Sequence, residues 1–256
     1  MEALHEGTER RMSEIPTATA YLTELTERIG RLLQHNRAAI ARAAEAIEKT
    51  GRADGLVYVF GTGHSHMLAE EAHYRAGGLA FAVPILSATT MVHEGAAAGT
   101  VFERMPGVVA PLFARYPIAA RDVLIVVSNS GVNAAPVEAA GIGKERGATV
   151  IAITSEAYSR EAARGRTRLA DVADIVLDNE APPGDAIVNV PESSLRVGPV
   201  STVIGAALID AVMAEAAARL QASGEGAPVY LSANVPGAAE VNAALAARYR
   251  PRNPHL

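Results

Sequence analysis

The stretch "VLIVVSNSGVNAAP" (Val123–Pro136) decides the fold of this chain. The aliphatic run Val123–Val127 predicts a buried β-strand, and a helical pattern begins near Pro136. Between them lies the polar segment Ser128–Gly131, with two hydroxyl groups and an amide. Hydroxyls and free backbone N–H groups at the start of a helix favour an anion, helped by the helix dipole. One serine would suffice as an N-cap, so this segment predicts an anion site beyond a plain turn.

Short apolar runs flank this stretch on both sides, and helical patterns separate most of them. Strands that alternate with helices predict a parallel sheet covered on both faces. We therefore expect an α/β, five-stranded, doubly wound domain, with Pro84 marking an edge strand. The other predicted strands are Leu56–Phe60, Leu79–Leu86, Thr149–Ile153 and Asp174–Leu177, and the separating helices are Met67–Ala76, Pro136–Arg146 and Ser159–Asp171.

Helical patterns also precede and follow this sheet. A long N-terminal pattern cannot be a crossover between strands, because no strand comes before it. The sequence predicts an N-terminal helical extension over residues 1–50, the α/β domain over 51–222 and a C-terminal tail over 223–256 that packs on the same domain or on a partner subunit. The helices expected in these parts are Ala18–Thr50, Pro199–Gln221 and Ala238–Arg248.

The composition excludes several classes of function. The chain has 256 residues, is 49% hydrophobic and carries a formal net charge of −5 without a long basic run, which argues against a nucleic-acid partner. No apolar stretch reaches the length of a membrane span, and the polar N-terminus lacks the apolar region of a signal peptide. Because there are no cysteines, disulfides, thiolate metal sites and a cysteine nucleophile are excluded. A cytoplasmic location is the simplest interpretation.

A second glycine-containing turn follows the first predicted strand, in "VYVFGTGHS" (Val57–Ser65). A dinucleotide site is disfavoured, because His66 stands where a third glycine would be needed and no acidic residue ends the next strand. A metal site is also possible by residue type, because several histidines and a glutamate lie in and after this turn. Their spacing matches no common zinc motif, and these side chains can equally hydrogen-bond loops or substrate. We expect no cofactor and no required metal. The residues considered for a metal are His64, His66, His73, His93 and Glu94.

Four short motifs of the sequence together resemble those of a known protein family. "FGTGHSH" (Phe60–His66), "VSNSGVN" (Val127–Asn133), "AITS" (Ala152–Ser155) and "VGPVST" (Val197–Thr202) resemble the motifs of the sugar isomerase (SIS) domain family, over roughly Thr17–Leu220. The resemblance implies a flavodoxin-like strand order, a homodimer or homotetramer and a site for a phosphosugar, or for a sulfonated sugar. The family usually has Thr where Asn133 stands. The binding residues implied by the motifs and by the hydroxyl-rich helix starts are Gly61, Gly63, Ser65, Ser128, Asn129, Ser130, Asn133, Ser201 and Thr202.

Aldose–ketose isomerisation needs a base beside the carbonyl and a group that opens the sugar ring. Glu94 and Glu138 are the candidate bases, and His93 and His64 are the candidate ring-opening acids. Glu94 lies beside His93 in a predicted loop of small residues. Functional residues often lie on loops, so this position favours a role for Glu94. Some members of the family have a Glu four residues after the glycine of the Ser128–Gly131 motif. This chain has Ala135 at that position.

Three functions therefore compete. The chain is an isomerase of a phosphorylated sugar, an ether lyase of the N-acetylmuramic acid 6-phosphate kind, or a non-catalytic phosphosugar sensor. Sensors usually carry a DNA-binding domain ahead of the SIS domain, and no basic recognition helix precedes the first strand here. We expect the isomerase.

Overall fold

The computed structural model describes residues 15–224 and 226–256 and contains one central parallel sheet. Its strand order is β2-β1-β3-β4-β5, which confirms the predicted flavodoxin-like arrangement, and β2 with Pro84 is an edge strand as expected. Buried aliphatic side chains fill every position of β1 and β3 except Tyr58, Phe60 and Gly61. The strands are β1 (Val57–Gly61), β2 (Ala82–Ile85), β3 (Val123–Val127), β4 (Thr149–Thr154) and β5 (Ile175–Asp178).

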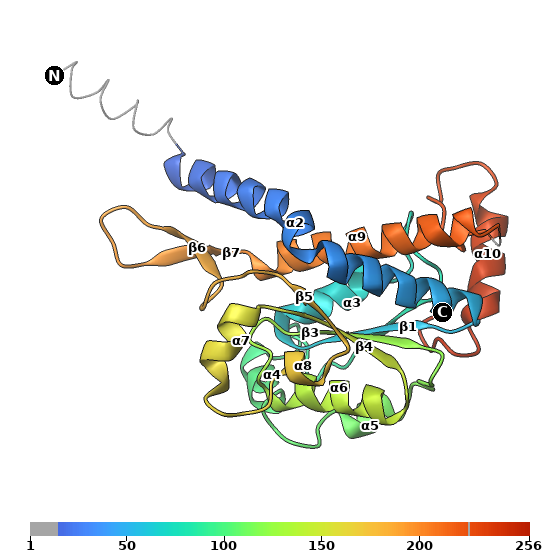
Figure 1. Ribbon diagram of the computed structural model, residues 1–256, viewed down its shortest axis with the longest axis horizontal. Helices are drawn as coiled ribbons and strands as arrows, with labels where there is room; N and C mark the ends of the chain where they lie inside the picture. The colour runs from blue at the N-terminus through green and yellow to red at the C-terminus, as the bar shows by residue number, and fades with distance from the viewer. Residues whose placement is uncertain (1–14, 225) are drawn as a thin grey trace, which may run out of the picture.

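Helices cover the sheet on both faces, as the alternating pattern predicted (Figure 1). On one face lie α2 (Pro16–Arg52), α3 (Met67–Glu71) and α9 (Ser201–Ala222), and α2 runs beside α9. The other helices are α4 (Ala96–Phe102), α5 (Ala110–Phe113), α6 (Ala134–Glu145), α7 (Glu156–Ala163), α8 (Leu169–Val172) and α10 (Ala238–Tyr249), with the 3-10 turn η1 (Gly63–His66) after β1. Among them, α6 packs on β3 and β4 on the opposite face. No helix within the described ranges is both long enough and apolar enough for a membrane crossing.

Several predicted boundaries were wrong, each for a local reason. The helix expected over Met67–Ala76 stops at Glu71, and a few residues later Tyr74 adopts a left-handed φ of 46°. The helix expected over Ser159–Asp171 is split into α7 and α8 by Arg164 and Gly165, which have φ values of 46° and 85°. Left-handed residues end a right-handed helix, so neither pattern could continue.

An antiparallel hairpin was missed. It consists of β6 (Ala186–Asn189) and β7 (Arg196–Pro199) and projects beside the first half of α2 (Figure 1). Pro199 therefore ends a strand and does not open the last long helix, which begins at Ser201. The strands are short and mostly half-exposed, so they carry no clear period-2 apolar pattern.

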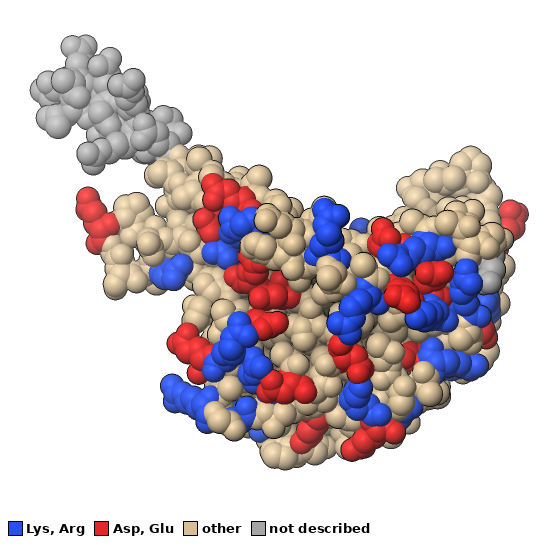
Figure 2. Space-filling view, viewed as in Figure 1, with Lys and Arg blue, Asp and Glu red and all other residues tan. Residues whose placement is uncertain are grey.

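The tail lies at the amino ends of the strands of its own domain. Arg248 in α10 pairs with Asp54, and Arg252 pairs with the buried Asp122 at 2.6 Å. Both partners lie just before strands, so the tail is at the opposite edge of the sheet from the motif loops. On the face shown in Figure 2, positive and negative side chains are intermixed. Residues 1–14 of the predicted extension lie outside the described part of the chain.

Gly61 is expected to be required for the turn after β1. An added Cβ would lie 2.4 Å from the carbonyl oxygen of Ser65, a backbone atom that cannot move aside cheaply. Gly61→Ala should therefore lower the free energy of unfolding by about 2–4 kcal/mol, measured by urea denaturation. Gly141→Ala is the matched control, because it lies in α6 with open space around it and should stabilise by about 0.5–1 kcal/mol. Equal effects of the two substitutions would contradict this account.

Candidate functional site

The motif loops meet where the strand order reverses. The chain goes from β1 to β2 on one side and then returns to place β3 on the other side of β1. Ligands of open α/β sheets bind at such a point, beyond the carboxyl ends of the strands. A cavity of about 10 Å³, with room for about one water molecule, lies here. It is lined by Ser65, Leu68, Val127, Asn129, Asn179, Ser201 and Thr202.

The turn after β1 brings Ser65 to this cavity. Gly61 allows the chain to fold back onto Ser65, and Gly63 adopts a left-handed φ of 54°. The N–H of Gly63 donates to the carbonyl of Thr90 at 2.8 Å, and the Nδ1 of the buried His66 hydrogen-bonds to the carbonyl of Gly63. His66 is thus a structural residue of the turn. Both predicted glycines serve the turn's geometry.

The loop after β3 is also held in place by its own hydrogen bonds. The N–H of Gly131 donates to the hydroxyl of Ser128 at 3.2 Å, and Gly131 has a φ of 61°. Asn129 accepts from the side chain of Asn179 at 3.2 Å, which ties this loop to the residue after β5. Ser128 is buried, whereas Asn129 and Ser130 are half-buried. The loop is therefore preformed, with polar groups at the cavity.

A partly buried carboxylate that the sequence did not single out connects two of the motifs. Glu103 accepts hydrogen bonds from the hydroxyl of Thr62 at 2.7 Å and from the side-chain amide of Asn133 at 3.0 Å. Its side chain is 16% exposed and also pairs with Arg104 at 2.7 Å. The amide of Asn133, expected to contact an anion, thus donates to a carboxylate here. Nothing local marks Glu103, because its partners are 41 and 30 residues away in the chain.

A second carboxylate, Asp185, lies at the start of α9. It accepts from the backbone N–H of Ser201 and from the Ser201 hydroxyl, both at 2.8 Å, and from the N–H of Val200 at 3.2 Å. Ser201 therefore lines the cavity while its hydroxyl is donated to Asp185. Thr202, next along the helix, also lines the cavity.

The four residues predicted to do the chemistry do not converge on this cavity. His64, His93 and Glu94 are exposed, and the ring of His93 lies 6.3 Å from that of His66. Both carboxylate oxygens of Glu138 accept from the N–H of Gly107 at 2.9 Å, so this side chain holds a loop. Within residues 15–224 and 226–256, no three His, Asp or Glu side chains are grouped so as to hold a metal ion.

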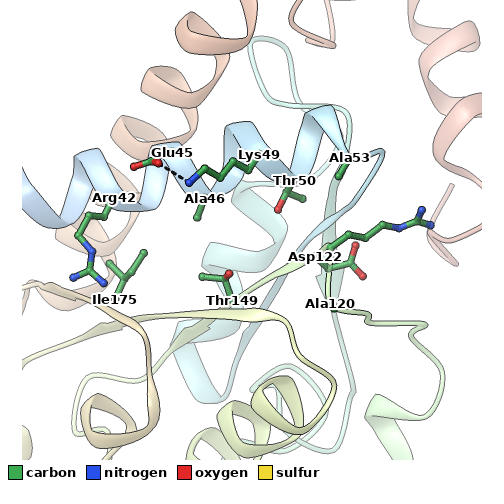
Figure 3. Close-up of a pocket in the computed structure, with 11 residues that line it drawn as sticks. Arg42, Glu45, Ala46, Lys49, Thr50, Ala53, Ala120, Asp122, Thr149 and Ile175 are labelled. Carbon is green, nitrogen blue, oxygen red and sulfur yellow. Dashed lines mark hydrogen bonds and ion pairs between the residues drawn. The ribbon is translucent and has the colours of Figure 1, made fainter.

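A larger hollow of about 390 Å³ lies at the opposite edge of the sheet, between α2 and the starts of the strands (Figure 3). Two of its three cationic side chains have partners: Arg42 donates to the carbonyl of Asp174 at 2.8 Å, and Lys49 pairs with Glu45 at 2.5 Å. None of the motif residues lines it. Size alone therefore does not identify the site, and the motif cavity remains the candidate.

Comparison with known proteins identifies the family of the chain. The family model described as "SIS domain" matches residues 20–155, which include β1, β3, β4 and the loops after them. The chain belongs to the SIS domain family. A protein of Brucella anthropi named UPF0309 protein is 56% identical over 236 residues, 92% of this chain and 97% of the relative, and one of Brucella suis is 55% identical over the same shares.

A solved structure shares this fold. A phosphoheptose isomerase from Francisella tularensis superposes with a TM-score of 0.52 at 18% identity, covering 80% of this chain and 98% of the other. At that identity the likeness shows the fold alone.

Loss of the Glu103 carboxylate should lower the stability of the folded protein. Glu103→Ala leaves Thr62 and Asn133 without their acceptor, and we expect the free energy of unfolding in urea to fall by about 1–3 kcal/mol. Glu94→Ala is the control, because Glu94 is exposed and a substitution there should change stability by less than about 0.5 kcal/mol. A Glu103 variant as stable as the Glu94 control would show that the two hydrogen bonds contribute nothing.

Proposed function

We propose that this SIS domain binds a sugar carrying one phosphate or sulfonate group and interconverts its aldose and ketose forms. The observation that carries the proposal is the preformed polar loop Ser128–Gly131, placed with Ser65 and Thr202 at the strand-order reversal. Neutral hydroxyls and N–H groups bind an oxyanion without distinguishing phosphorus from sulfur. The cavity is narrower than a sugar, so binding requires the surrounding loops to move apart.

Isomerisation through an enediol moves one proton between two neighbouring carbons. A carboxylate base takes the proton from the carbon next to the carbonyl, and the same group returns a proton to the former carbonyl carbon. Glu94 and Glu138 are the bases proposed from the sequence. We add Glu103, because it hydrogen-bonds Thr62 and Asn133, one from each of two motif loops. His93 or His64 is proposed to open the ring from the exposed side.

Deuterium incorporation tests the reaction and identifies the base. The purified protein, with and without a chelator, is incubated in D₂O with a panel of ketose and aldose phosphates, and exchange at C1 and C2 is followed by NMR. We expect exchange that survives the chelator and falls by at least about 100-fold in Glu103→Gln, while Glu94→Gln and Glu138→Gln lose less. Loss of exchange in one of the latter two alone would move the base to that residue.

Two other outcomes would replace the isomerase. Release of lactate from an amino-sugar phosphate would favour an ether lyase. Binding of sugar phosphates, detected by a rise in melting temperature, without exchange on any of them would favour a binding module. Absence of both binding and chemistry would overturn the proposal.

We also propose that the protein is a homo-oligomer assembled through α2. The helix has 37 residues, about 55 Å of length, and all its buried positions lie from Leu32 onward. Leu22, Ile29 and Leu33 follow one another at spacings of seven and four, which places them on one face, and their exposed fractions are 59%, 42% and 55%. An apolar stripe on a projecting helix is suited to pairing with the same stripe of a second copy.

Charges placed in this stripe should separate the subunits. Leu22→Asp with Ile29→Asp should give a monomer in size-exclusion chromatography with light scattering, where the unmodified chain gives a dimer or tetramer. Val101→Asp is the matched control, since Val101 in α4 is 60% exposed but lies elsewhere on the surface. An unmodified chain that is already monomeric would refute the assembly, and an oligomer unaffected by both aspartates would refute this interface.

A further inference from the structure

The start of α9 already holds an anion that belongs to the chain itself. The N-cap residue is Val200, whose side chain cannot accept a hydrogen bond, and no side-chain cap is present there. Asp185, which immediately precedes the hairpin strand β6, supplies its carboxylate instead and accepts three hydrogen bonds of 2.8–3.2 Å. Two of the backbone N–H groups that this helix start could offer to a bound anion, those of Val200 and Ser201, are therefore engaged.

The backbone of Asp185 is held in an uncommon conformation to make these contacts. Its φ is 68°, a left-handed value that Asp adopts more readily than most residues but at some energetic cost. The carboxylate reaches across 15 and 16 positions of sequence, from one end of the hairpin to the helix that follows it. The hairpin and the start of α9 are thus fixed around one negative charge.

The loop after β3, which reaches the cavity through Asn129, is different in charge. Among the described residues, the hydrogen bonds of residues 128–131 involve backbone groups, hydroxyls and amides but no carboxylate. Ser201, on the α9 side, lines the same cavity and is bonded directly to Asp185. The Asp185 carboxylate therefore lies directly behind Ser201 in the wall of the cavity, whereas the loop after β3 brings no carboxylate to it.

We infer that Asp185 is a specificity-determining residue that limits the site to sugars with a single anionic group. The inference rests on the proposed function. The anion of the substrate binds at the Ser128–Gly131 loop, and the neutral hydroxyl groups at the other end of the sugar face Thr202 and Asp185. A sugar with a second phosphate at that end would meet the carboxylate, and like charges held close together are strongly unfavourable.

Discrimination between mono- and bisphosphates tests this role. We would measure binding of fructose 6-phosphate and fructose 1,6-bisphosphate by titration calorimetry to the unmodified chain and to Asp185→Asn. The substitution keeps an acceptor for the α9 N–H groups and removes the charge. We expect at least about a tenfold preference for the monophosphate, falling below about threefold in Asp185→Asn. Asp54→Asn, at the other edge of the sheet, should keep the full preference.

Inorganic phosphate gives a second measurement that does not depend on the sugar. In a Ser128→Ala, Ser130→Ala background, phosphate should leave the melting temperature unchanged while Asp185 is present. With Asp185→Ala added, the freed start of α9 should bind phosphate, and the melting temperature should rise with its concentration. A background that already responds to phosphate, or an added variant that does not respond, would overturn the role of Asp185.

The two proposals fail in distinguishable ways. If no sugar phosphate of the panel binds the unmodified chain, the proposed function is wrong and the phosphate measurement alone decides the role of Asp185. If the monophosphate binds and the preference over the bisphosphate is absent or survives in Asp185→Asn, the inference is wrong and the proposed function stands.

Discussion

The pairing of β1 with both β2 and β3 is the constraint on which the rest of the structure depends. Because β1 lies between two strands that follow it in the chain, the connections leave its two sides in opposite directions. The loops after β1 and β3 are left facing one another at the carboxyl edge, with α9 beginning beside them. The polar residues that line the cavity reach it from this arrangement, and the buried aliphatic strands hold the loops in register.

Two carboxylates give this site its chemical character. Glu103 and Asp185 come from segments that are neither motif loops nor strands, and each takes up donors that the motifs would otherwise offer to an anion. A site of hydroxyls and helix starts alone would attract anions throughout. The loop Ser128–Gly131 makes no hydrogen bond to either carboxylate, which is why a phosphorylated sugar is proposed to bind there through its anion.

The sequence predicted the layers of the fold well and the helix boundaries less well. Strands such as Val123–Val127 were found because a run of β-branched residues between turns has few alternatives once both faces are buried. The hairpin β6–β7 was missed because half-exposed short strands carry no periodic signal. The split between α7 and α8 was missed because Arg164, a residue with no turn preference of its own, adopts a left-handed conformation under tertiary constraints.

The sequence by itself determined the alternation of strands and helices and the hydroxyl-bearing loops, because these depend on local patterns, and its contiguous motifs carried the family resemblance that implied the strand order. The motif resemblance and the hydroxyl-rich helix starts singled out Ser65, Asn129, Ser201 and Thr202, and these four residues line one cavity in the structure. Only the tertiary structure decided that Asn133 and Ser201 donate to carboxylates, and that Glu138 supports a loop while Glu103 joins two motifs. The physical reason is that a hydrogen bond forms between groups that are close in space, and the residues of these pairs are 16 to 41 positions apart in sequence.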